Sequence, residues 1–423
     1  MSYRLQGLAT AAAFLFAILP SMATTASADI VVTRDGKFLP DKIGEGLSPS
    51  EYPSDDALQR SGKGNVELRY DKVKVGRDSV NAGFVMDVYC TEASRDPVFS
   101  NAMNQARAGF FMEAAASFQE AAETLRDGDR QVAMWRRLEC LRLAGDADKA
   151  KAAAGELIAA FPEGYYVPQA YILLARIGVA QGKAAEARDA LGKVAALPNV
   201  NVRDLFEAAV SEIDWLVFPA ARNAQGYAAA EKAYRDLVQK IKGKNAAAEA
   251  AIPLMKAQVG IGKSLVAQGK GKDALPFFTD VVNNKESLTD KSLLASAYKG
   301  LGDIVYLDVQ AKKAGAGKDQ VQALIDDLDT AALHYMRVCH FYKDEAGDSL
   351  QPAWQSGAQV LEWQFDLAGK RDAESLALLE RSVNMYYQAH KMMPNGEAKR
   401  QLTSHIRELL ERRDALRNEL AAK

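Results

Sequence analysis

The stretch GKGKDALPFFTDV, Gly269 to Val281, places Gly269, Ala274, Phe278 and Val281 at intervals of five, four and three residues. A glycine permits the backbone conformation of a tight turn. The three residues after it lie on one face of a helix, because positions three and four apart are neighbours on a helix surface. A small alanine on that face lets a second helix approach, and the aromatic ring fills the space beside it. The stretch therefore predicts the turn and the second helix of a helical hairpin.

The same spacing recurs along the chain, which indicates internal repeats. The other copies are Gly109, Ala114, Phe118 and Ala121; Gly145, Ala150, Ala154 and Leu157; Gly182, Ala187, Leu191 and Val194; Ala230, Tyr234 and Leu237; Ala331, Tyr335 and Val338; and Ser382, Tyr386 and Ala389. Pro162, Pro198 and Pro394 stand where three of these helices are expected to end. About seven repeats are predicted in tandem over residues 95–395.

This arrangement resembles the tetratricopeptide repeat family, whose unit has about 34 residues. The resemblance implies a mainly α fold, a right-handed α-solenoid of antiparallel helix pairs preceded here by a small β-rich module. The repeats of this chain are longer than the family unit. The distance between successive anchors is 36 residues from Ala114 to Ala150 and 57 residues from Ala274 to Ala331. Ala311 to Gln320 is expected to be an inserted loop. Residues 396–423 contain an amphipathic segment, Lys399 to Ala422, which is expected to cap the end of the array.

Residues 29–92 have a different pattern and predict the β module. Ile30 to Val32 are β-branched and precede Asp35-Gly36, a strong hairpin turn signal. VELRYDKVKV, residues 66–75, alternates apolar and polar side chains, and Phe84 to Cys90 has the composition of a last strand. Four or five strands are expected, as a small barrel or a sheet packed on the helices.

Residues 1–28 have the features of a cleaved export signal. Arg4 precedes the apolar run Leu8 to Leu19, and Ala26-Ser27-Ala28 is a small-residue cleavage site before Asp29. The alternative is a membrane anchor, but 12 residues of helix span only about 18 Å, against roughly 30 Å of hydrocarbon. Export to the periplasm or to the medium of a bacterium is expected, and no cysteine near the cut offers a site for lipid.

Composition argues against some functions. The net charge of −2 gives no electrostatic signature of nucleic-acid binding. Three cysteines do not make a disulfide framework. Cys140 and Cys339 lie in apolar helical patterns that predict buried free thiols, with a bridge between Cys90 and Cys140 as the alternative.

AQVGIGKS, Ala257 to Ser264, fits a relaxed phosphate-binding loop, and DIVYLD, Asp303 to Asp308, resembles the strand that holds Mg²⁺ in such enzymes. A phosphate-binding loop requires a strand before it and a helix after it. Here Gly262 stands where the repeat needs a small residue in its first helix. We therefore expect both segments to be helical, with no nucleotide or other cofactor.

Histidine and cysteine offer little further chemistry. His334 and His340 lie six residues apart, roughly 240° round a helix, so they do not share a face, and no metal site is predicted. His390 and His405 are expected to be isolated and exposed. No catalytic motif is recognisable, so the chain is not expected to be an enzyme.

The resemblance implies that a partner protein or peptide binds along the concave face formed by the first helix of each pair. The inward positions there are Trp135, Glu139 and Arg142; Gln169, Ile172 and Arg176; and Lys256, Val259 and Lys263. For each of them the alternative is a solvated charge or, for Trp135, a half-buried core position. The expected function is a non-catalytic exported scaffold or adaptor. A stoichiometric subunit of an envelope assembly or secretion machine, and an enzyme with its site between the β module and the first repeats, are the alternatives. Self-association stays open.

Overall fold

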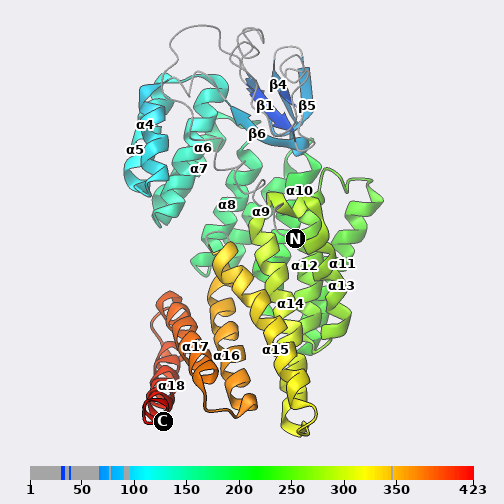
Figure 1. The fold of residues 1–423 in the computed structure, drawn as a ribbon. Helices are drawn as coiled ribbons and strands as arrows, with labels where there is room; N and C mark the ends of the chain where they lie inside the picture. Colours follow the sequence, from blue (N-terminus) through cyan, green and yellow to red (C-terminus); the bar gives the residue numbers. More distant parts are fainter. Residues whose placement is uncertain (1–29, 34–37, 40–65, 76–77, 90–95, 344–345) are drawn as a thin grey trace. The chain divides into compact units, whose positions relative to one another are not determined.

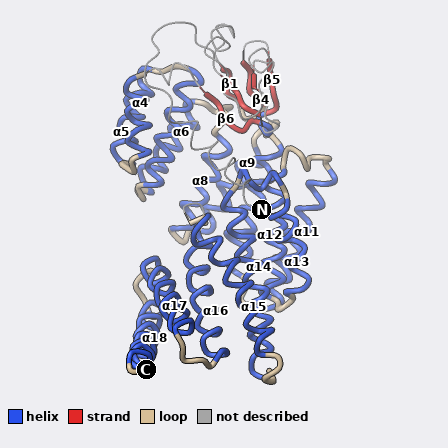
Figure 2. Tube along the Cα trace, viewed as in Figure 1, coloured by secondary structure: helices blue, strands red, loops and turns tan. Residues whose placement is uncertain are grey.

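The computed structural model describes residues 30–33, 38–39, 66–75, 78–89, 96–343 and 346–423. The predicted signal sequence and the Asp35-Gly36 turn lie outside these residues. The chain forms two compact units, residues 1–208 and 209–423, and each is described by itself. Figures 1 and 2 show strands in the first unit and helices throughout the rest.

Within its described residues, the β module contains six strands in two antiparallel sheets, with orders β2-β1-β6 and β3-β4-β5. They are β1 (Ile30–Thr33), β2 (Phe38–Leu39), β3 (Val66–Leu68), β4 (Lys72–Val75), β5 (Asp78–Asn81) and β6 (Val85–Tyr89). The expectation of four or five strands was therefore too low. Residues 66–75 contain two strands because the chain reverses between them, pairing Val66 with Val75 and Leu68 with Val73.

The first unit continues with three helix pairs and part of α10. The helices are α4 (Pro97–Arg107), α5 (Phe111–Thr124), α6 (Asp127–Leu143), α7 (Ala147–Ala160), α8 (Val167–Ala180), α9 (Ala184–Ala196) and α10 (Val202–Glu212). Gly109, Gly145 and Gly182 turn the chain within the pairs, each with a positive φ. Residues other than glycine rarely adopt this left-handed conformation. We call the first helix of each pair helix A and the second helix B.

The second unit consists of helices. They are η3 (Ile213–Val217), η4 (Phe218–Ala220), α11 (Ala224–Gly243), α12 (Ala251–Ala267), α13 (Gly271–Asn283), η5 (Lys285–Thr289), α14 (Lys291–Lys312), η6 (Lys313–Gly315), α15 (Val321–Met336), η7 (Arg337–Phe341), η8 (Gly347–Ser349), α16 (Leu350–Ala368), α17 (Ala373–Met392) and α18 (Glu397–Ala421). Among these, η3 and η7 are π-helical and η4, η5, η6 and η8 are 3-10 turns.

The predicted anchors of helix B are confirmed as the core. Every anchor residue that follows the turn in the seven copies of the pattern has an exposed fraction of 5% or less. Phe118, Phe278 and Tyr335 are fully buried. Helices α7, α9 and α17 end two residues before Pro162, Pro198 and Pro394, as expected.

The β module is joined to the helices of its own unit through the edge of β3. The Leu68 carbonyl accepts hydrogen bonds from the Tyr165 N–H and from Gln131 Nε2, each at 3.2 Å. The Tyr70 N–H donates to the Glu163 carbonyl at 3.2 Å. The turn between α7 and α8 thus completes hydrogen bonds that an uncovered strand edge would leave open.

Helix α18 packs on α17, with Leu402, Ile406, Leu409 and Leu416 buried. The expectation that His405 is isolated was wrong, because its Nε2 lies 2.9 Å from Glu362 Oε2 on α16. His390 is not isolated either, since its Nε2 lies 3.0 Å from Thr403 Oγ1. Both contacts join residues far apart in sequence, which no local pattern reveals.

Candidate partner-binding surface

The helix-A side of α6 and α8 carries an aromatic pair. Trp135, on α6, is half-buried and stacks on Tyr166, which precedes α8, with ring centroids 5.1 Å apart and planes 5° apart. Tyr165 meets Tyr166 edge to face at 4.9 Å. Trp135 therefore contributes to packing between neighbouring repeats and still presents part of its ring to solvent.

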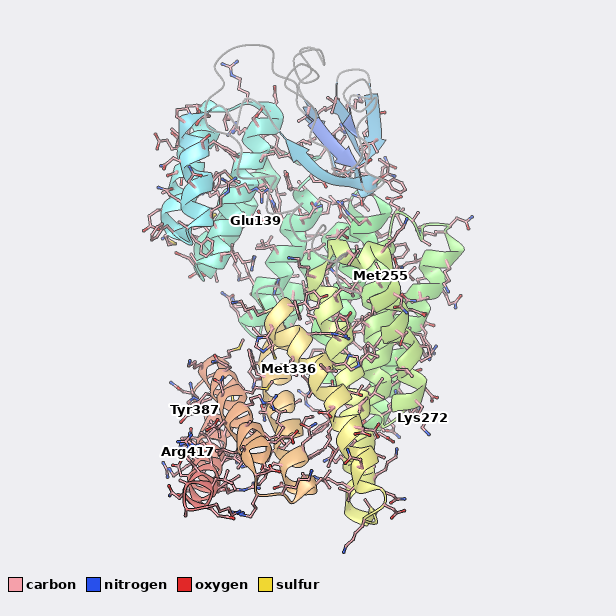
Figure 3. The ribbon with its side chains drawn as sticks, in the orientation of Figure 1. Glu139, Met255, Lys272, Met336, Tyr387 and Arg417 are labelled. Carbon is pink, nitrogen blue, oxygen red and sulfur yellow. The ribbon has the colours of Figure 1, made fainter. Side chains whose placement is uncertain are left out.

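Charged residues continue this surface along the two helices. Glu139, labelled on α6 in Figure 3, pairs with Arg136 at 2.9 Å. One turn further, burial and then the positive charge of Arg176 on α8 lower the pKa of the Arg142 guanidinium. Arg142 and Arg176 are thus close enough for their positive charges to interact, while the negative charge of Glu139 raises the Arg142 pKa.

Neither Arg142 nor Arg176 has an ion-pair partner among the residues that the structure describes. An anion placed between them would relieve the repulsion and accept hydrogen bonds from both. We call the group of Trp135, Glu139, Arg142, Tyr166 and Arg176 the α6–α8 surface.

Gln169 is bound within the protein. Its Nε2 donates to Asp204 Oδ2 at 3.1 Å, while its Oε1 is buried and has no hydrogen-bond partner among the described residues. Ile172 is half-buried on the same helix. Of the three positions predicted on α8, Arg176 is the one whose side chain is exposed.

A buried polar cluster that the sequence pattern did not predict lies at the start of α10. Asn201 Nδ2 donates to the Tyr70 carbonyl at 2.8 Å, and Arg203 Nη1 donates to the Val85 carbonyl at 3.0 Å. Asp204, with a side chain only 4% exposed, accepts from Arg203 at 2.9 Å. The one signal in the sequence was Asn201 itself, a favoured residue just before a helix. The cluster fixes the β module against the third helix pair.

The predicted positions on α12, in the second unit, differ among themselves. Lys256 lies 3.8 Å from Asp290, and Val259 is buried. Lys263 is half-buried and has no ion pair within the described part of the chain. Lys263 is therefore the residue of this group that remains available to a partner.

The segment Ala257 to Ser264 is helical throughout and lies inside α12. Asp303 to Asp308 likewise lies inside α14. Neither segment has the strand and turn that direct backbone N–H groups at a phosphate. The expectation that both belong to helix A is confirmed.

Close packing of glycine on aromatic rings joins the helix pairs. A Cβ atom added to Gly262 would lie 2.7 Å from the Phe278 ring of the same pair, and one added to Gly302 would lie 2.9 Å from Tyr335. Gly260 and Gly300 make the same contact with the ring of the preceding pair. The Phe278 ring thus fits between α12 and α14, two consecutive A helices. The helix pairs are tetratricopeptide-like repeats.

The glycine contacts also align the repeats with one another. Gly262 and Lys263 correspond to Gly302 and Asp303, because each glycine faces the aromatic anchor of its own pair. The Tyr335 hydroxyl donates to Asp303 Oδ1 at 2.8 Å, whereas Phe278 has no hydroxyl. The tyrosine anchor Tyr335 is therefore matched by an acidic residue at the aligned position of helix A. The phenylalanine anchor Phe278 is matched there by Lys263.

No family model matches the sequence, and no curated protein matches it. Three similar solved structures are a tetratricopeptide repeat protein from Parabacteroides merdae, the TPR domain of P58(IPK) and yeast Tom70, with identities of 13%, 15% and 11%. The matches cover 74%, 76% and 77% of this chain and 99%, 99% and 98% of theirs, with TM-scores of 0.41, 0.22 and 0.22. Because these scores are low, the repeat assignment rests on the packing of glycine and alanine against the anchors.

The remaining predicted groups lie within the tetratricopeptide-like repeats. Cys140 and Cys339 are buried free thiols, as expected, and Cys90 of the alternative bridge lies outside the described residues. Burial raises the pKa of the Cys140 thiol to about 11. His334 is half-buried beside Tyr298 and His340 is exposed beside Trp354. The described residues hold no group of three side chains suited to a metal, and none of their helices could span a membrane.

Proposed function

We propose that this chain is an exported, non-catalytic scaffold that binds a protein segment on the α6–α8 surface. The observation that carries the proposal is the proximity of Arg142 and Arg176, which have no ion-pair partners among the described residues and lie roughly two turns along α6 from the Trp135–Tyr166 stack. Arginine binds carboxylates through two parallel hydrogen bonds, and exposed aromatic rings add contact area at little entropic cost. The occupant that fits is an extended segment with an acidic side chain.

A non-catalytic role is supported by the close packing at the junction between the β module and the repeats. A Cβ added to Gly128, at the start of α6, would lie 2.8 Å from the Val66 carbonyl oxygen. Arg203 and Asn201 already bind strand carbonyls there. The polar groups at this junction are engaged in holding the module in place.

Photocrosslinking in cells tests the proposal. A photoreactive residue replaces Arg176, and a control replaces Glu120 on the exposed side of α5. For the second unit, Lys263 is paired with Lys272, an exposed residue near the start of α13 (Figure 3). We expect a discrete crosslinked partner from Arg176 and none from Glu120. Equal products at all four sites would contradict the proposal.

Charge reversal separates specific binding from general contact. Arg142→Glu and Arg176→Glu should each weaken the partner's affinity about tenfold or more, since charged hydrogen bonds contribute roughly 1.5–3 kcal/mol. Lys183→Glu, in the turn before α9, is the matched control, because Lys183 already pairs with Glu186 at 3.3 Å. Equal effects of all three changes would refute a specific site.

The same experiment distinguishes a free adaptor from a machine subunit. A permanent subunit should be recovered with its partner in equal amounts, while an adaptor is recovered with less. Export is tested by sequencing the N-terminus of the mature protein, which we expect to begin at Asp29. A chain that retains Met1 would contradict the proposed cleavage.

A further inference from the structure

The second unit contains an aromatic pair that already holds a cation. Tyr306 on α14 and Trp363 on α16 stack with ring centroids 4.5 Å apart and planes 9° apart. Lys313 Nζ lies 3.4 Å from the centroid of the Trp363 ring. An ammonium group over the face of tryptophan is attracted by the negative charge density of that face. Two helices and a loop thus build a site for one positive charge.

Two carboxylates lie near the Tyr306 hydroxyl, at one side of this site. Burial, followed by the negative charges of Asp303 and Glu362, raises the pKa of the Tyr306 hydroxyl. Asp303 lies one turn before Tyr306, and Glu362 directly precedes Trp363. Asp303 also pairs with Lys299 at 2.6 Å, and Glu362 pairs with Arg412 at 3.4 Å, so each carboxylate already has a cation of its own.

The cation comes from the inserted loop, Ala311 to Gln320. Lys313 begins η6, directly after α14 ends at Lys312. Between residues 311 and 320, only Lys313 and Ala316 are partly buried, and all the others are exposed. Gly315 and Gly317 lie in the same stretch and give its backbone freedom. The loop is held by few contacts, so its lysine can leave the rings at little cost to the rest of the unit.

We propose that the Tyr306–Trp363 pair is a binding site for a lysine side chain of a partner protein, and that Lys313 fills this site in the free protein. A lysine is the occupant that fits, because the chain's own ammonium group already shows the distance and the ring face that such a group takes. Binding by the partner displaces Lys313 and frees the loop. The partner's apparent affinity is its intrinsic affinity multiplied by the fraction of molecules whose rings are free of Lys313.

This site is independent of the α6–α8 surface. It belongs to the second unit and prefers a cation, whereas Arg142 and Arg176 prefer an anion. Failure of one proposal therefore leaves the other in place.

Fluorine NMR of the full mature chain, labelled with 5-fluorotryptophan, tests the proposal. Trp363→Phe assigns the Trp363 signal. If that variant does not fold, Tyr306→Phe identifies the same signal by its shift, because loss of the hydroxyl changes the electron density of the ring that stacks on Trp363. The variant is Lys313→Gln, and the matched control is Lys318→Gln, an exposed residue of the same loop. We expect Lys313→Gln to move the Trp363 signal and Lys318→Gln to leave it unchanged.

The probe is the peptide acetyl-Gly-Lys-Gly-amide, with acetyl-Gly-Gln-Gly-amide as its neutral counterpart. In the Lys313→Gln protein, the lysine peptide should return the Trp363 signal toward its original position. Its affinity should be at least tenfold higher than for the unaltered chain, and the glutamine peptide should have no effect. Equal shifts from both peptides, or equal behaviour of the two variants, would overturn the proposal.

Discussion

Replacing Gly300 by alanine tests the packing that joins the repeats. Gly300 lies on α14, where an added Cβ would fall less than 3.0 Å from three atoms of the Phe278 ring. The same ring atoms are approached from α12 by Gly262, and Phe278 is fully buried. The ring has no direction in which to move, so the helices must separate.

The sign of the change in unfolding free energy shows whether helix propensity or overpacking dominates. Alanine is favoured over glycine in a helix interior by about 1 kcal/mol. Overpacking a buried site costs about 1–3 kcal/mol, and a ring held on both sides belongs near the upper end. We expect Gly300→Ala to lower the free energy of unfolding by about 1–2 kcal/mol.

Urea unfolding followed by circular dichroism measures this change. Hydrogen exchange of peptides from α12 to α14 localises it, because a chain of two units need not unfold in one step. The control is Gly192→Ala on α9, where an added Cβ meets nothing within 4 Å and a gain of about 0.5–1 kcal/mol is expected. Gly300→Ala combined with Phe278→Leu should recover part of the loss. A Gly300→Ala protein at least as stable as the unaltered chain would refute the packing argument.

Three further predictions concern buried polar groups. Tyr335→Phe should lower the free energy of unfolding by about 1 kcal/mol in urea melts, because Asp303 loses the hydrogen bond from the Tyr335 hydroxyl. Arg203→Ala should cost about 3–5 kcal/mol and speed hydrogen exchange in β4 and β6, because it leaves the buried Asp204 carboxylate without its cation; equal exchange rates would contradict this. The pKa of the Cys339 thiol is raised by burial from 9.0 to about 12, so its contribution to stability is complete below pH 9 and is lost as the pH rises toward 12. Urea midpoints between pH 8 and pH 11 should therefore fall more steeply in the unaltered chain than in Cys339→Ala.

Local periodicity was enough to predict the repeats. The interval from Gly269 to Phe278 is set by a turn and a helix face, both properties of a dozen consecutive residues. The same reasoning predicted the helix α18, because its leucines recur at helical intervals. It also placed Ala257 to Ser264 inside a helix, against a superficial motif.

Pairings between distant residues could not be predicted in this way. Residues 66–75 alternate as one long strand would, and the reversal at their centre is fixed by the turn between α7 and α8 almost 100 residues later. The bond between His405 and Glu362 joins two helices with another between them. For the predicted surface, the sequence placed Arg142 and Arg176 on helix A. It contained no sign that Gln169 would bind Asp204 instead.

The attachment of the β module has a consequence for synthesis. Asn201, which binds the Tyr70 carbonyl, is 131 residues further along the chain. At about 5–20 residues per second, a ribosome needs roughly 7–26 seconds to make that interval. During this time the strands exist without the asparagine and arginine that later secure them, while the first two helix pairs can already close. Fragments that stop before Asn201 keep the nascent chain in that intermediate condition, with the Tyr70 and Val85 carbonyls unbound by Asn201 and Arg203 and open to pairing with other copies.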